Sequence, residues 1–305
     1  MTYVEARFRR QLSQSDFDRY ALLSGDDNPI HCDPVFAGRS HFGATVAHGM
    51  FLYGLIYRAL ADAMPGPGFL QVEQDLMFPN PGFDGDEVEV LVTPLAVLPD
   101  GSFCFDTSVS KQVRGATVVA AEGRARAIAA GSNAALAAYA GLEADVTNLA
   151  NTADAVDRLA HGDVPLRGLR RAMHATAQRT FGSADLADYA GLTGDSNPLH
   201  GAGAWAVEHG FAGRLVPPPL LAAMFSDLLG TSLPGRGTGW MKQTLRFVAP
   251  AYLGERITAR VEIVRLRADK ELVNLASSLV GGDGRLICRG QSLVLVRNLE
   301  PCAIA

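Results

Sequence analysis

The chain contains only four cysteines among 305 residues, no excess of positive charge and no long uninterrupted apolar run. Cys32, Cys104, Cys288 and Cys302 lie far apart, with no CxxC pair and no spacing typical of metal ligands, so we expect reduced, mostly buried thiols and no metal site. The net charge of −5 leaves no surplus of cations to neutralise phosphates, which argues against a nucleic-acid partner.

The most apolar stretch, residues 48–64, carries Arg58 and Asp62 and is short for a membrane span. It is better interpreted as a helix buried within the protein. The N-terminal residues include no apolar core typical of a signal sequence. We therefore expect a cytoplasmic protein without a membrane partner. With 48% hydrophobic and 19% charged residues, the chain is long enough for two globular domains.

One loop sequence occurs twice. The copies are Tyr20-Ala-Leu-Leu-Ser-Gly-Asp-Asp-Asn-Pro-Ile-His31 and Tyr189-Ala-Gly-Leu-Thr-Gly-Asp-Ser-Asn-Pro-Leu-His200. Asp26 corresponds to Asp195 and His31 to His200 at a constant offset of 169 positions. Further pairs keep this offset, among them Phe42 with Phe211 and Pro81 with Pro250. A register held over so many residues predicts a tandem duplication.

The same order of elements is predicted in each half. A short strand is followed by a helix, with Ser13 and Asp16, or Ser183 and Asp185, as capping signals. After the loop come a small helical turn, one long buried helix and three strands with period-two alternation. The expected ranges are 3–9, 48–64, 86–92, 103–109 and 118–128 in the first half, and 173–179, 218–230, 256–266, 272–280 and 286–296 in the second.

This order predicts an α+β fold in which an antiparallel sheet wraps around each long helix. Residues 1–130 and 169–305 are the two predicted domains. Residues 131–168, which are rich in Ala, Gly, Asn and Asp, are the predicted linker, with a helix expected over 134–142.

The loop also suggests a chemistry. Asp26 and His31 flank Asn28-Pro29, and this turn is short enough to aim both side chains at one water molecule, as a general base requires. We expect Asn28 to hold the turn and Gly25 to give the backbone freedom before it. A turn with a merely packed histidine is the structural alternative, but turn geometry alone does not explain why Asp and His recur in both copies.

A second candidate feature, the start of a helix, follows the first loop. Ala47-His48-Gly49-Met50 opens the long helix, whose free N–H groups favour developing negative charge, so the start of this helix predicts an oxyanion site at Gly49 supported by His48. In the second half the aligned residues are Val216-Pro217-Pro218-Pro219, and proline has no N–H to donate. The helix is still expected to begin there.

The run from Tyr20 to Ala37, followed by Ala47-His48-Gly49-Met50, resembles the signature of MaoC-like, (R)-specific enoyl-CoA hydratases, which are hot-dog proteins. The resemblance implies a double hot dog, an internal pseudo-dimer with a thioester tunnel near its interface, and leaves a further homodimer open. It implies Asp26 and His31 as the catalytic pair and Gly49 as the donor to the thioester carbonyl. Asp195 and His200 form a possible second site, although Pro218 replaces the glycine.

The implied reaction adds water to a trans-2-enoyl thioester, or runs in reverse, without metal or redox cofactor, because coenzyme A or a carrier pantetheine belongs to the substrate. Three alternatives stay open: a dehydratase or isomerase acting on carrier-bound acyl groups, a thioesterase of the same fold, and a non-catalytic acyl-thioester-binding subunit. Candidate pocket residues are Phe51, Phe69, Trp205 and Trp240, and candidate phosphate contacts are Arg39, Arg58, Lys111 and Arg246.

Overall fold

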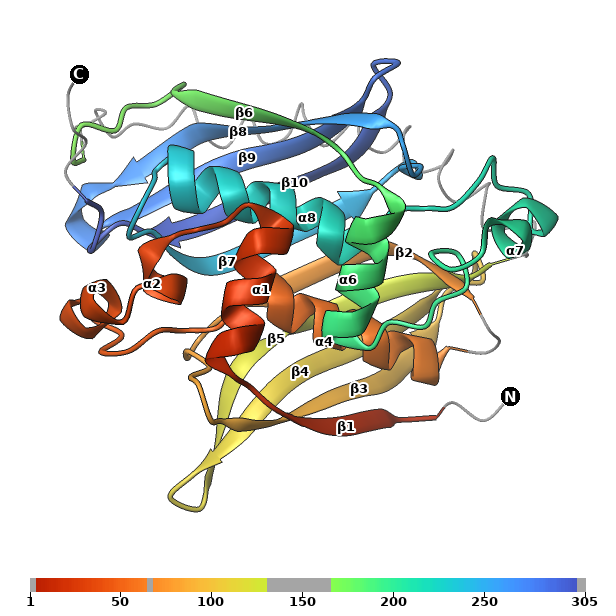
Figure 1. Cartoon of the computed structure of the whole chain (residues 1–305), viewed down its shortest axis with the longest axis horizontal. Coiled ribbons are helices and arrows are strands. Elements are labelled where there is room, and N and C mark those ends of the chain that lie inside the picture. The colour runs from red at the N-terminus through yellow and green to blue at the C-terminus, as the bar shows by residue number, and fades with distance from the viewer. Residues whose placement is uncertain (1–3, 65–67, 131–165, 301–305) are drawn as a thin grey trace.

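A single antiparallel sheet of ten strands organises the protein (Figure 1). The structure is a computed structural model that describes residues 4–64, 68–130 and 166–300. The strand order is β1-β3-β4-β5-β2-β7-β10-β9-β8-β6, so each half supplies five neighbouring strands and the halves join where β2 pairs with β7. The strands are β1 (Ala6–Gln11), β2 (Phe69–Met77), β3 (Glu87–Val97), β4 (Phe103–Val113), β5 (Ala116–Ala129), β6 (His174–Thr180), β7 (Gly239–Phe247), β8 (Arg256–Arg267), β9 (Leu272–Gly281) and β10 (Leu286–Leu295).

Two long helices, one from each half, lie side by side against this sheet, and α1 and α6 pack beside them (Figure 1). The helices are α1 (Gln14–Ser24), α2 (Pro29–Cys32), α3 (Pro34–Arg39), α4 (Gly49–Ala63), α6 (Ser183–Thr193), α7 (Gly203–Glu208) and α8 (Pro218–Asp227), with a π turn η1 (Leu228–Ser232) and a 3-10 turn η2 (Ala268–Lys270). The long helix predicted over 48–64 is therefore confirmed as α4, and the one predicted over 218–230 as α8 with its π turn.

Helix α4 is held in place by burial on almost every side. Phe51, Tyr53 and Ile56 have no exposed surface, and Met50 and Leu60 are equally buried. Each such side chain contributes roughly 1.5–3 kcal/mol when it leaves water. The helix is largely apolar because the sheet, α8 and α6 enclose most of it, and its partly exposed side carries the Arg58–Asp62 ion pair. Its first residue, Gly49, is thereby fixed relative to both halves.

The sequence-based elements are confirmed with two corrections. Ser13 and Asp16 form the expected capping box of α1, but α6 is capped differently: Ser183 is already helical, and the Asp185 carboxylate accepts from Gly182 N. The central strands β2 and β7 were not predicted. Polar side chains at fully buried positions obscure their apolar alternation, namely Gln71, Gln74 and Gln243.

Other predictions are met only in part. Cys288 is buried, but Cys32 and Cys104 are half-buried, so the expectation of mostly buried thiols is wrong for two of the three described cysteines. Cys302, most of the predicted linker and the helix expected over 134–142 lie outside the described residues. The domain boundaries at 130 and 169 stay predictions. Within the described residues, no helix combines the length and apolar character that a membrane span needs.

The sheet depends on close backbone contact at Gly123 in β5. An ideal Cβ at this position would lie 1.8 Å from the carbonyl oxygen of Asp75 in the neighbouring β2. We expect Gly123→Ala to destabilise the protein by at least about 2 kcal/mol, because backbone atoms cannot simply rotate away. Gly38→Ala, in α3 with nothing within 4 Å of the added methyl, is the control and should match the wild type or exceed it. Equal urea midpoints for the two variants would contradict this packing.

Candidate active site

The loop between α1 and α2 places Asp26 and His31 by local backbone chemistry. Gly25 ends α1 in the left-handed region (φ 85°), which turns the chain sharply before Asp26. Asn28 is the N-cap of α2 and Pro29 its first residue. The Asn28 side chain does more than hold this turn: its Nδ2 donates to Thr238 O (3.0 Å) and its Oδ1 accepts from Gly237 N (3.0 Å), both in the second half.

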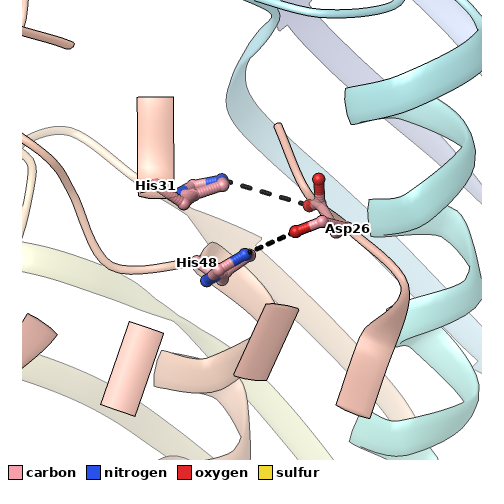
Figure 2. A group of neighbouring side chains, drawn as sticks. All are labelled: Asp26, His31 and His48. Atoms are coloured by element: carbon pink, nitrogen blue, oxygen red, sulfur yellow. Dashed lines mark hydrogen bonds and ion pairs between the residues drawn. The ribbon is translucent and has the colours of Figure 1, made fainter. Parts of the chain in front are cut away.

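Asp26 and His31 face each other closely enough for one water molecule to hydrogen-bond both side chains (Figure 2). His31 Nε2 lies 4.0 Å from Asp26 Oδ2, too far for a direct hydrogen bond and suitable for a bridging water. His31 Nδ1 donates to Val46 O (2.7 Å), which leaves Nε2 of the neutral ring as an acceptor. Two acceptors thus point at one position, an arrangement that can take a proton from water.

His48 links the start of α4 to the catalytic loop. Its Nε2 donates to the backbone carbonyl of Asp26 (3.0 Å), and its ring stacks on that of His31 with centroids 3.7 Å apart (Figure 2). The residue is fully buried, and its Nδ1 has no hydrogen-bond partner among the residues that the structure describes. The imidazole therefore fixes the helix start against the loop.

The second half completes the surroundings of the Asp26 carboxylate. Ser226, on α8, donates from Oγ to Asp26 Oδ2 (2.5 Å), while Asn28 N donates to Oδ1 (3.2 Å). Sequence reasoning missed Ser226. The repeat aligns it with Tyr57, but only the packed structure shows that each of these residues faces the loop of the other half.

Burial sets the ionisation of this group. The loss of water raises the pKa of Asp26 to about 7, against the hydrogen bond from Ser226, which lowers it. Burial likewise lowers the pKa of His31 to about 4, and the pKa of His48 lies well below its usual value for the same reason. Near neutral pH both imidazoles are therefore uncharged, and the carboxyl changes its charge close to pH 7.

Gly49 opens α4 beside this pair, and its N–H lies in the first helical turn, where such groups have no partner within the helix. An ideal Cβ on Gly49 would lie 2.8 Å from the ring of Phe78, so a larger residue would press on that ring. Asp26, His31 and Gly49 line one cavity of about 510 Å³, together with Ser226 and Trp240 from the second half. Of the predicted pocket residues, Trp240 lines this cavity, Phe69 lines a smaller cavity beside His200, and Phe51 and Trp205 line neither.

The second loop repeats the backbone pattern of the first loop, but the space beside its histidine is occupied by a side chain. His200 Nδ1 bonds to Leu215 O (2.9 Å) as His31 bonds to Val46, yet His200 Nε2 bonds to the Tyr57 hydroxyl (2.8 Å). The adjoining cavity is about 20 Å³, the size of a single water at most, and Asp195 does not line it. Helix α8 begins at Pro218, as predicted, so no N–H is available at the position of Gly49.

Asp26, His31 and His48 are also the group of potential metal ligands in the described residues, with their ligand atoms within 4.8 Å of one another. His48 Nε2, however, already donates its hydrogen to Asp26 O, so its lone pair is not directed at the other two. The set therefore suits water better than a metal ion.

The four candidate phosphate contacts do not line this large cavity. Lys111 pairs with Asp86, Arg246 with Asp75, and Arg58 lies over the Phe8 ring. Arg39, Arg58, Lys111 and Arg246 are all absent from the lining of the large cavity.

The fold and site together define a double hot-dog protein. A conserved hypothetical protein of Mycobacterium tuberculosis with a double hot-dog fold superposes with a TM-score of 0.67 over 97% of this chain and 96% of that one, at 12% identity. The family model described as MaoC like domain matches residues 2–96 and 167–280. The chain belongs to this family, as the sequence motifs predicted.

Two relatives match single segments of the chain. An (R)-specific enoyl-CoA hydratase of Aeromonas caviae is 38% identical over 120 residues, which is 39% of this chain and 90% of that protein. A mitochondrial 3-hydroxyacyl-[acyl-carrier-protein] dehydratase of Solanum lycopersicum is 34% identical over 123 residues, which is 40% of this chain and 73% of the relative.

The ionisation of Asp26 should be visible in stability. Because its pKa is about 7 in the folded protein and near 3.8 when unfolded, the folded state holds the proton more tightly, and wild-type stability falls as the pH rises through this window. Asn at this position has no charge to bury. We expect the stability of Asp26→Asn relative to wild type to increase by about 1–3 kcal/mol between pH 5 and pH 8.

Urea unfolding at the two pH values measures this difference. Asp27→Asn is the matched control, because the neighbouring Asp27 side chain is 68% exposed, and it should show no comparable gain. A difference between Asp26→Asn and wild type that does not change with pH would contradict the assignment.

Proposed function

We propose that the protein is a hydro-lyase that adds water to a trans-2-enoyl thioester to give an (R)-3-hydroxyacyl thioester, or catalyses the reverse dehydration. The observation that carries this proposal is the pairing of Asp26 with His31 across 4.0 Å, beside the start of α4 in one cavity. The names of the relatives, an (R)-specific enoyl-CoA hydratase and a 3-hydroxyacyl-carrier dehydratase, support the reaction class.

In the proposed mechanism, a water held between Asp26 Oδ2 and His31 Nε2 attacks C3 of the enoyl group. The pair accepts one proton of this water as the C3–O bond forms, and one member returns a proton to C2. A pKa of about 7 suits Asp26 to this exchange, because the group both accepts and releases a proton near neutral pH. Burial keeps His31 neutral by lowering its pKa to about 4, and the hydrogen bond from Nδ1 to Val46 O leaves Nε2 without a hydrogen, as the acceptor.

Gly49 is proposed to act on the thioester carbonyl of the substrate. As the water adds, negative charge develops on the thioester oxygen, and the N–H of Gly49 at the positive end of α4 is suited to stabilise it. Losing one such donor costs about 3–4 kcal/mol in comparable sites. The proposed chemistry requires no metal or redox cofactor; coenzyme A or a carrier pantetheine is part of the substrate.

The second loop is proposed to be inactive. The Tyr57 hydroxyl is hydrogen-bonded to His200 Nε2, and the adjoining cavity is too small for an acyl chain. In addition, Pro218 has no N–H to donate to an oxyanion. The proposal therefore assigns one active site to the chain, formed by Asp26, His31 and Gly49 with Ser226 from the second half.

Hydration of crotonyl-CoA, followed by loss of the conjugated thioester absorbance, tests the function. Asp26→Asn and His31→Ala should each lower kcat/KM by about 10²–10⁴-fold, the contribution of a general acid or base. Asp195→Asn is the matched variant at the equivalent position of the second half and should retain wild-type activity.

Each rival function gives a different result. Isomerisation without incorporation of water points to an isomerase, and release of free coenzyme A points to a thioesterase. Crotonyl-CoA bound without turnover favours the non-catalytic binding subunit. Undiminished hydration by an Asp26→Asn/His31→Ala double variant would move the chemistry to Asp195 and His200.

A further inference from the structure

The helix that carries Ser226 does not end as a regular α-helix. After Asp227, α8 widens into the π turn η1, closed by a hydrogen bond from Leu233 N to Leu228 O (2.7 Å). The equivalent helix α4 keeps α-helical bonding to its end, where Met64 N donates to Leu60 O (3.0 Å). Single π turns are rare and are enriched at functional sites. The π turn, which α4 lacks, therefore points to a functional role for the end of α8.

The π turn brings the backbone of Gly230 against the Asp26 side chain. An ideal Cβ on Gly230 would lie 2.3 Å from Asp26 Oδ1 and 3.0 Å from Asn28 Cβ, so no side chain fits there. Gly230 is not among the described residues with positive φ, so clearance rather than an unusual backbone angle requires glycine. Ser226, one turn earlier on the same helix, donates to the other carboxylate oxygen at 2.5 Å. The carboxylate is thus confined on both sides by one helix.

We propose that Gly230, held in the π turn, is a positioning residue that keeps the Asp26 carboxylate directed at His31. Its consequence for catalysis rests on the proposed function, but the positioning itself does not. Because Oδ1 and Oδ2 are both restrained, the carboxylate keeps the orientation in which Oδ2 lies 4.0 Å from His31 Nε2.

The second half of the repeat offers an internal comparison. Gly25 and Gly194 correspond, and an ideal Cβ on each approaches an equivalent side chain, Asp227 at 3.4 Å and Arg58 at 3.6 Å. Helix α4 therefore faces the second loop as α8 faces the first.

The residue of α4 equivalent to Gly230 is Ala61, which carries the methyl group that Gly230 lacks. Asp195 is only half-buried, and among the described residues it makes no ion pair with His200 like that of Asp26 with His31. The helix without a π turn and glycine thus accompanies the loop whose carboxylate is the less buried of the two.

Gly230→Ala tests the proposal. We expect kcat for crotonyl-CoA hydration to fall at least about 10-fold with KM within about threefold, because the methyl group displaces the carboxylate and not the substrate. In an Asp26→Asn background the same substitution should have no further effect, since Gly230 acts only through Asp26. Ala61→Gly, the matched change on α4, should keep wild-type kcat. An additive loss in the double variant, or a wild-type kcat for Gly230→Ala, would overturn the proposal.

A second measurement does not depend on the reaction. The carboxyl carbon of Asp26 can be followed by ¹³C NMR through a pH titration and assigned by its absence in Asp26→Asn. Gly230→Ala should move the titration midpoint by at least about half a pH unit, because it alters both burial and the Ser226 hydrogen bond. If wild type shows no hydration but the midpoint moves, the proposed function fails and the positioning stands; an unmoved midpoint overturns the positioning.

Failure of Gly230→Ala to fold has its own control. Asp26→Ala removes the carboxylate that the new methyl group meets. The double variant Gly230→Ala/Asp26→Ala should then fold, with a urea midpoint close to that of Asp26→Ala alone, because only the milder contact with Asn28 Cβ at 3.0 Å remains. Failure of this double variant to fold would place the conflict elsewhere in the helix and contradict the proposal.

Discussion

The hydrogen bond from Ser226 to the Asp26 carboxylate joins the two halves of the chain at the point where the proposed chemistry occurs. Asp26 is buried because the second half covers it, and this burial raises its pKa to about 7. Removing a carboxylate from water is unfavourable unless hydrogen bonds replace the lost hydration. Ser226 Oγ and Asn28 N supply those bonds, so the site exists only when both halves are packed together.

Because the chain is duplicated, the contact between a long helix and the loop of the other half occurs twice, and the two contacts differ. At equivalent positions, Ser226 leaves room beside Asp26, whereas Tyr57 fills the space beside His200. One interface is an open cavity of about 510 Å³ and the other retains about 20 Å³. In the proposed active site, the first half contributes the acid, the imidazole and the helix start, and the second half contributes the surface that buries and orients the acid. The two halves have thus taken complementary roles in one site.

Much of this arrangement was predictable because it depends on local chemistry. The turn at Asn28-Pro29, the helix start at Gly49 and the loss of N–H donors at Pro218 follow from residue type and spacing alone. The strands β2 and β7 were missed because buried glutamines interrupt their pattern. Ser226 and Gly230 were missed for a different reason: their contacts span some 200 residues, and only the packing of α8 against the first loop identifies them.

We propose that one site per chain, at the interface of the two halves, binds the acyl thioester. Calorimetric titration with crotonyl-CoA measures this directly in Asp26→Asn, which we expect to bind the thioester without rapid turnover. We predict one equivalent bound per chain, and no binding once Ser226→Tyr is added to place the blocking side chain of the second site in the first. Two equivalents per chain, or binding unaffected by Ser226→Tyr, would contradict a single site formed by both halves.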